Sequence, residues 1–188
     1  MNQDQLNAII EASADTILSL KGLQEEILRV CDCVVSALKS GNKVLTAGNG
    51  GSAAEALHMS EELVGRFRGD RVSLPAVSLV ADSTALTCIA NDYGYDKVFS
   101  RQVEGLGCKG DVLVLFSTSG KGDVLLNAAR ASAAKGVSTI GLLGRDGGPL
   151  ASQCDLSIIV PGSATERIQE AHQLLLHIIL DAVEVAFV

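Results

Sequence analysis

A glycine-rich segment between an apolar run and a helical pattern constrains the fold of this chain more than any other feature. Residues 44–47 (Val-Leu-Thr-Ala) are typical of a buried strand, residues 48–52 (Gly-Asn-Gly-Gly-Ser) predict a loop, and the small and apolar side chains of residues 53–59 predict a helix. A helix that begins directly after such a loop points its free backbone N–H groups and the positive end of its dipole at one place. We therefore expect an anion, most simply a phosphate, to bind there.

Strand, loop and helix recur along the rest of the chain. Apolar runs predict further strands at 75–80, 111–116, 138–143 and 156–160, and we expect helices at 84–90, 124–135 and 165–186. Hydrophobic residues make up 47% of the chain but aromatic residues only 3%, so aliphatic side chains must fill the core. Aliphatic strands that alternate with helices are typical of a parallel sheet covered on both faces. The sequence thus predicts an α/β fold, in which ligands bind at the carboxyl ends of the strands.

A separate helical pattern precedes this core. Apolar residues recur at helical spacing from about Gln3 to Ser40, which predicts two helices or one long helix strained near Lys21-Gly22. Such an arm covers the sheet or packs on a second subunit. Because the 188 residues contain no low-complexity linker, we expect one domain, with a helical arm at 1–40 and a core at 41–188.

Charge and cysteine usage exclude several classes of partner. The net charge is −7 and no basic tract is present, so neither nucleic acid nor an anionic membrane surface is expected as a partner. None of the five cysteines stands in a C-x-x-C pair, and the N-terminus lacks the pattern of a secretion signal. The apolar C-terminal run is interrupted by His177, Asp181 and Glu184, which indicates a core or interface helix rather than a membrane span. We expect a cytoplasmic protein with free thiols.

A second polar loop follows the strand predicted at 111–116. It reads Ser117-Thr118-Ser119-Gly120 and opens a helix, so its hydroxyls and backbone N–H groups suit a small phosphate. Each loop also has a simpler interpretation, as a structural glycine turn or a helix-capping cluster. Neither loop has the G-x-G-x-x-G pattern or the lysine of a P-loop. Two such loops at one edge of a sheet favour a phosphorylated small molecule.

The histidines lie on the two helices that flank this edge. His58 and Glu62 are four residues apart on the first helix and share a face. On the last helix, Gln169, His172 and His177 are expected on a broadly shared side, among apolar positions where a polar group needs a partner. His58, Glu62, Gln169 and His177 either hydrogen-bond one another or bind one metal ion, and spacing alone does not choose between these alternatives.

Taken together, the motifs resemble the phosphoheptose isomerases of the sugar isomerase (SIS) domain family. The resemblance extends over nearly the whole chain, in order: Gly48-Asn49-Gly50-Gly51-Ser52, His58-x-x-x-Glu62-Leu63-x-Gly65-Arg66, Asn91-Asp92-Tyr93-Gly94, Ser117-Thr118-Ser119-Gly120, Gly144-Arg145-Asp146-Gly147-Gly148 and Arg167-Ile168-Gln169-Glu170-x-His172. It implies a three-layer αβα sandwich with a central parallel sheet, preceded by N-terminal helices. It also implies a homotetramer with sites near subunit interfaces.

The resemblance further implies an activity and its residues. The family converts sedoheptulose 7-phosphate to D-glycero-D-manno-heptose 7-phosphate, the first step of bacterial heptose synthesis for lipopolysaccharide or related glycans. Its acid/base pair falls on Glu62 and His177, and in members with zinc, one ion per subunit, the ligands fall on His58, Glu62, Gln169 and His177. The implied substrate contacts are Asn49, Gly50, Ser52, Glu62, Arg66, Asn91, Asp92, Ser117, Thr118, Ser119 and Gln169.

Two positions depart from the family pattern. Where the family usually reads S-T-S-G-N-S, this chain has Lys121-Gly122 after Gly120, which removes the last serine and leads us to expect a loop shorter by one residue. The family's aspartate before R-I-Q-E is Glu166 here, one methylene longer.

Two functions other than isomerisation are compatible with the same loops. Relatives of these isomerases include a non-catalytic binding protein that associates with the bacterial replication initiator and lacks the C-terminal histidine, and a sugar-phosphate sensor would use the same phosphate loops. Because this chain keeps His58, Glu62, Gln169 and His177 together, we expect an enzyme that works through an enediol. Glu62 would move a proton between neighbouring carbons of the sugar, and His177 would protonate and deprotonate the oxygens on those carbons.

Overall fold

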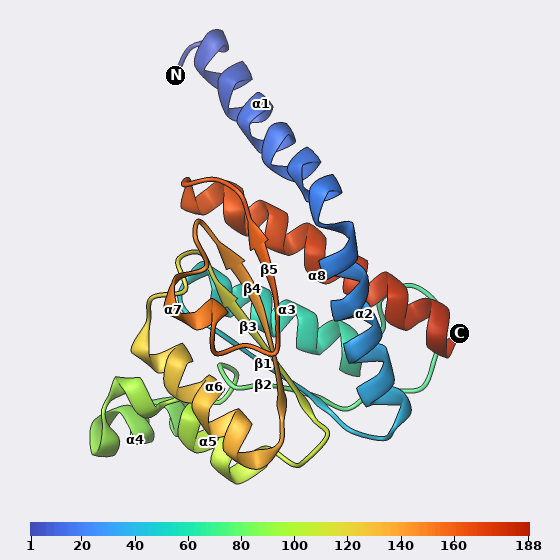
Figure 1. The fold of residues 1–188 in the computed structure, drawn as a ribbon, viewed down its shortest axis with the longest axis vertical. Coiled ribbons are helices and arrows are strands. Elements are labelled where there is room, and N and C mark those ends of the chain that lie inside the picture. The colour runs from blue at the N-terminus through green and yellow to red at the C-terminus, as the bar shows by residue number, and fades with distance from the viewer.

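A five-stranded parallel sheet forms the centre of the molecule in the computed structural model, which describes residues 1–188 (Figure 1). The strands lie in the order β2-β1-β3-β4-β5, and each neighbouring pair is parallel. Their bounds are Val44–Gly48 (β1), Ala76–Ser78 (β2), Val112–Ser117 (β3), Ser138–Gly144 (β4) and Leu156–Val160 (β5). The inner strands β1 and β3 are almost wholly buried, as their continuous apolar runs require.

Helices cover both faces of the sheet, which confirms the predicted αβα sandwich. One face packs against residues of α2, α3 and α8 in a core cluster of 26 buried residues. The other packs against residues of α5, α6 and α7, with α4 at its margin, in a cluster of 16. The bounds are Gln3–Ser19 (α1), Gln24–Lys39 (α2), Gly51–Val64 (α3), Ser83–Tyr93 (α4), Ser100–Leu106 (α5), Asp123–Lys135 (α6), Gly148–Ala151 (α7) and Thr165–Phe187 (α8).

The strand order changes direction between β1 and β3. From β1 the chain moves to β2 on one side, and all later strands add on the other side, beginning with β3. The carboxyl ends of β1 and β3 lie level, since Gly48 pairs with Phe116 in the register. In open parallel sheets, the crevice at such a reversal is where ligands bind. Both predicted phosphate loops leave the sheet at this point.

The N-terminal arm is broken where the sequence predicted a break. A 3₁₀ helix, η1 (Leu20–Leu23), separates α1 from α2. Helix α1 has no buried residue and extends away from the rest of the molecule, whereas α2 packs on the sheet (Figure 1). The arm therefore both covers the sheet and projects from it. No helix in the structure is both long enough and apolar enough to cross a membrane.

Three elements differ from the prediction. The strand expected at 75–80 is only Ala76–Ser78, because β2 is an edge strand with a partner on one side, and its Val77 side chain is exposed. Helix α5 was not predicted, because its sequence SRQVEGL offers too few apolar residues for a helical pattern, and the four residues of α7 are too few to form one. None of these differences alters the edge at which the two loops meet.

Candidate functional site

A polar cavity of about 310 Å³ lies where the loops after β1 and β3 meet the first turn of α8. The first loop contributes Asn49 and Ser52, and the second contributes the hydroxyl residues 117–119. Helix α8 closes the cavity with Thr165 and Gln169. The prediction that the two loops share one site is therefore confirmed in its geometry.

The N-terminus of α3 faces this cavity without a side-chain cap. Its N-cap is Gly50, which has a φ of 59° and offers no side-chain acceptor to the first N–H groups. Gln169 packs closely above the turn, since a Cβ added to Gly51 would lie 2.4 Å from its Nε2 atom. A site of this kind leaves the positive end of the helix dipole available to an anion.

The conformation of the second loop, Ser117 to Gly120, is fixed by contacts of its own residues. The Gly120 N–H donates to Ser117 Oγ at 2.9 Å. Gly120 has a φ of 61°, and a Cβ there would lie 1.9 Å from the carbonyl oxygen of Gly147, so only glycine fits. No hydrogen bond within the chain occupies the hydroxyls of Thr118 and Ser119, which line the cavity. These hydroxyls can donate to a bound phosphate.

A second polar cluster lies further along α3 and α8. His58 Nε2 is 3.3 Å from Glu62 Oε1, and the His58 and His177 rings meet edge to face with centroids 5.2 Å apart. Gln173 joins them, because its Nε2 atom lies 2.6 Å from His58 Nδ1 and 3.3 Å from His177 Nε2. The ring of Phe67 stacks on His177 at 5.7 Å. Three of the four predicted metal ligands, His58, Glu62 and His177, are thus brought together.

Gln173 is a residue that the sequence analysis missed. When its amide N–H donates to His58 Nδ1, the His58 proton resides on Nε2 and is donated to Glu62. Gln173 lies four residues after Gln169 and four before His177, so the three form one stripe along α8. That spacing is the only signal in the sequence that could have identified it. Gln169 itself lines the phosphate cavity, and no hydrogen bond links it to the histidines.

The expectation that His172 shares a side with Gln169 and His177 is wrong. His172 is fully buried, with Nε2 3.1 Å from the carbonyl oxygen of Leu143 in β4. Its Nδ1 atom lies 3.8 Å from Glu55 Oε2 on α3. The step of five positions from His172 to His177 turns the helix by about 140° beyond one full turn, which directs these two side chains differently.

Several of the implied substrate contacts lie outside the cavity. Arg66 is exposed on the segment after α3, and Asn91 and Asp92 are exposed near the end of α4, where Asn91 Nδ2 donates to Asp92 Oδ1. The segment after α4 still reaches the first loop, because Tyr95 Oη donates to Asn49 Oδ1 at 2.8 Å. The sequence carried no signal for this contact.

The two departures from the family pattern also lie at this edge. Gly122 lines the cavity, whereas the Lys121 side chain is exposed and does not. Glu166 is exposed in the first turn of α8. Neither side chain therefore adds a charge to the cavity lining.

The donor set at the second cluster suits a metal ion. One ligand atom each of His58, Glu61 and Glu62 lies within 4.8 Å of the others. Imidazole nitrogens with a carboxylate oxygen are ligands that zinc prefers. Glu61, which the sequence analysis did not single out, is exposed beside this set.

Comparison with known proteins gives consistent matches over most of the chain. The family model described as SIS domain matches residues 8–144. A phosphoheptose isomerase of Nitratiruptor sp. is 51% identical over 153 residues, which is 81% of this chain and 82% of that protein. A solved phosphoheptose isomerase from Neisseria gonorrhoeae superposes with a TM-score of 0.92 at 38% identity, covering 97% of this chain and 98% of that one. Another, from Francisella tularensis, has a TM-score of 0.94 at 31% identity and covers 98% and 100%.

Proposed function

The chain belongs to the phosphoheptose isomerases of the SIS-domain family, and from this premise we propose that Glu62 and His177 interconvert an aldose and a ketose beside the phosphate cavity. The substrate is sedoheptulose 7-phosphate, the product is D-glycero-D-manno-heptose 7-phosphate, and the reaction belongs to heptose synthesis. The observation that carries this proposal is the convergence of α3 and α8. They bring His58, Glu62 and His177 together next to a hydroxyl-lined anion cavity.

The phosphate group fixes one end of the opened sugar. The α3 N-terminus and the hydroxyls of Ser52, Thr118 and Ser119 surround the place where its oxygens would bind. Helix α3 advances about 1.5 Å per residue, so His58 lies about 9 Å and Glu62 about 15 Å beyond Ser52 along its axis, and the sugar would extend along α3 from the phosphate toward the second cluster. Anchoring the phosphate therefore presents the carbonyl end of the sugar to the second cluster, with little freedom left.

The chemistry is a proton transfer between neighbouring carbons. Glu62 removes a proton from C1 of the ketose while His177 protonates the oxygen on C2, which gives an enediol. His177 then accepts the proton of the C1 hydroxyl as Glu62 returns its proton to C2, and the aldose results. No oxidant or reductant is consumed. His58 donates to Glu62, and Gln173 contacts both imidazoles, so these two residues would orient the acid/base pair.

We also propose one zinc ion per subunit. His58, Glu62, Gln169 and His177 would hold it, and zinc supplies a Lewis acid that polarises a carbonyl. Glu62 cannot be a firmly held ligand and a free base at once, so these two roles would compete or alternate. The proximity of three of these side chains supports the proposal. Gln169 would have to extend from the phosphate cavity toward them.

A cytoplasmic homotetramer accounts for surfaces that one chain leaves open. Helix α1 exposes Leu6, Ile9 and Ile10, and an apolar hollow of about 450 Å³ lies between η1, α2 and α8. A second copy packed there would cover both surfaces. Arg66, Asn91 and Asp92, which are exposed away from the cavity, would then serve sites near subunit interfaces.

Isomerisation in deuterium oxide tests the proposed function directly. If the proton on the Glu62 carboxyl exchanges with solvent before it is returned, the purified protein forms the aldose phosphate with deuterium on C2, detected by NMR or mass spectrometry. Glu62→Gln and His177→Gln should each abolish turnover and keep the circular dichroism of the wild type. Either variant retaining nearly the wild-type rate would refute the assignment. A stoichiometric initiator partner, found together with no isomerisation with or without zinc, would instead favour the non-catalytic function.

A further inference from the structure

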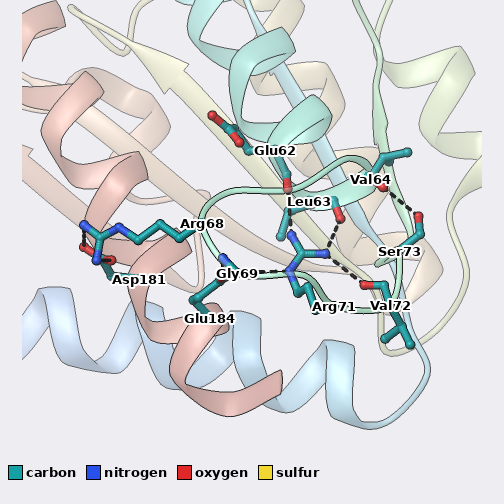
Figure 2. Close-up of polar contacts among 10 residues, drawn as sticks. All are labelled: Glu62, Leu63, Val64, Arg68, Gly69, Arg71, Val72, Ser73, Asp181 and Glu184. Atoms are coloured by element: carbon teal, nitrogen blue, oxygen red, sulfur yellow. Dashed lines mark hydrogen bonds and ion pairs between the residues drawn. The ribbon is translucent and has the colours of Figure 1, made fainter. Parts of the chain in front are cut away.

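The segment 65–73 connects α3 to β2 and carries one residue that contacts the second cluster and one that the family resemblance implicates. Arg66 is an implied substrate contact, and Phe67 stacks on the ring of His177. This segment has no helix or strand of its own. Some other interaction must therefore fix its path beside the second cluster (Figure 2).

A buried arginine supplies that interaction from within the segment. The Arg71 side chain is 1% exposed. Its Nη2 donates to the carbonyl oxygen of Glu62 at 2.7 Å, and its Nη1 donates to those of Leu63 at 3.0 Å and Val72 at 2.9 Å (Figure 2). Arg71 therefore contacts the backbone of the same residue whose side chain we propose as the catalytic base.

Glu184 connects Arg71 to α8. Its Oε2 lies 3.4 Å from Arg71 Nε, and its Oε1 accepts the backbone N–H of Gly69. Glu184 is seven residues after His177, which is about two helical turns, so both lie on the same side of α8. The pair thus links the segment to the helix that presents the second catalytic residue.

The segment also satisfies the C-terminus of α3 completely. The last carbonyls of a helix have no partner within the helix. Here the Glu61 carbonyl accepts a hydrogen bond from the Gly65 N–H, and the Val64 carbonyl accepts one from Ser73 Oγ. Arg71 donates to the carbonyls of both Glu62 and Leu63. The Leu63 carbonyl also accepts from the Leu74 N–H. The positive guanidinium also lies at the negative end of the helix dipole. The turn that contains Glu62 is therefore held from both the segment and α8.

We propose that the Arg71–Glu184 pair is a positioning device for the isomerase reaction. It sets the last turn of α3 and the segment 65–73 against α8, and so fixes Glu62 and Phe67 relative to His177. This inference rests on the proposed roles of Glu62 and His177. The pair touches no part of the phosphate cavity, which lies at the opposite end of α3.

A neighbouring ion pair provides a matched control. Arg68 pairs with Asp181 in the same segment and on the same helix, at 2.6 Å, but their side chains are 66% and 42% exposed (Figure 2). Exposed pairs of this kind contribute roughly 0–1 kcal/mol to stability. The Arg68 guanidinium carbon also lies 5.0 Å from the centroid of the Phe67 ring, and lysine keeps a cation there. Arg68→Lys and Asp181→Asn should therefore leave the reaction as it is.

The test compares Arg71→Lys and Glu184→Gln with these two controls. Lysine keeps the charge of Arg71 but loses the planar fork that reaches three carbonyls, and glutamine keeps the shape of Glu184 but loses its charge. We expect kcat for sedoheptulose 7-phosphate to fall by about 10- to 100-fold in both variants, because small displacements of catalytic groups have effects of this size. The dissociation constant of inorganic phosphate, measured by calorimetry, should stay within about twofold because the cavity is distant.

Hydrogen exchange provides a readout that does not depend on turnover. We expect the amides of residues 65–73 to exchange about tenfold faster in Arg71→Lys and at the wild-type rate in Arg68→Lys. If Arg71→Lys does not fold, Glu184→Gln is judged by the same criteria. A folded variant with wild-type kcat, or equal losses in variants and controls, would overturn the inference. An inactive wild type would overturn the proposed function instead, and hydrogen exchange would still decide whether the pair fixes the segment.

Discussion

The two ends of α3 are built in opposite ways. At its N-terminus no side chain caps the first N–H groups, and the hydroxyls of Thr118 and Ser119 in the facing loop have no partner within the chain. At its C-terminus every one of the last four carbonyls has a donor, and Arg71 donates to two of them. Unsatisfied polar groups are useful only where a ligand completes them, and satisfied groups hold a side chain in place. One helix therefore combines an N-terminus that faces the phosphate cavity, which we call the binding end, with a C-terminal half that carries His58 and Glu62, which we call the chemical end.

Glu62→Gln should have the largest effect and should act at the chemical end alone. The amide cannot accept the proton from carbon, so we expect kcat to fall by about 10³-fold, within the range of general-base contributions. KM should change little, because Ser52 and the second loop are untouched. Steady-state kinetics on sedoheptulose 7-phosphate measures both. A rise in KM as large as the loss in kcat would show that the two ends do not act separately.

Zinc should stabilise the chemical end and not the binding end. A metal present at about 100 times its dissociation constant stabilises a native protein by about 2.7 kcal/mol. We expect zinc to raise the melting temperature of the wild type and of Ser52→Ala, and to leave that of His58→Gln unchanged. Equal zinc affinity of the wild type and His58→Gln, measured by calorimetry, would place the metal elsewhere.

Ser52→Ala should produce the reverse of the Glu62→Gln result. A hydrogen bond to a charged group contributes about 1.5–3 kcal/mol, so its loss should raise KM by about 10- to 100-fold. The kcat value should stay close to that of the wild type, since His58 and Glu62 lie further along α3. Kinetics and phosphate binding together provide the check. If kcat falls and KM does not rise, Ser52 takes part in the proton transfer, and the two ends of α3 do not have separate roles.

Gly122→Ser should have the smallest effect and should strengthen the binding end. Gly122 lines the cavity with an ordinary φ of −85°, and an added Cβ would lie 3.7 Å from Val124 Cγ1. A serine there would offer the phosphate one more hydroxyl, which should lower KM by about two- to tenfold. Lys121→Gln is the control, because the Lys121 side chain is exposed outside the cavity and should not affect KM. An unchanged or higher KM in Gly122→Ser would mean that the phosphate does not extend to this position.

The sequence predicted the binding end better than the chemical end. The two loops could be placed together because parallel strands bring their carboxyl ends to one edge, so strand patterns alone bring Ser52 close to residues 117–119. Strand and helix bounds were also close, except at the short edge strand β2 and at α5 and α7, which were not predicted. Patterns of apolar residues report burial, and burial is what determines these elements.

The chemical end depends on side-chain directions that patterns do not encode. Gln173 is one more polar residue on an apolar helix, and only the structure shows that it lies between two imidazoles. Arg71 is one of several arginines in a segment without regular structure, and its partner Glu184 is 113 residues away. His172 was placed on the wrong side because a broad helical face does not distinguish residues that differ by half a turn.

The separation of the two helices along the chain has a consequence for biosynthesis. His58 and Gln173 touch across 115 residues, and α8 is the last helix of the chain. Contacts of such high sequence separation close late, because the loop between them must be ordered first. During translation the phosphate loops emerge well before α8, and domains generally fold as units as they are synthesised. Because Thr165 and Gln169 of α8 also line the anion cavity, neither the cavity nor the cluster around His58 and Glu62 is complete until α8 has been synthesised and has docked.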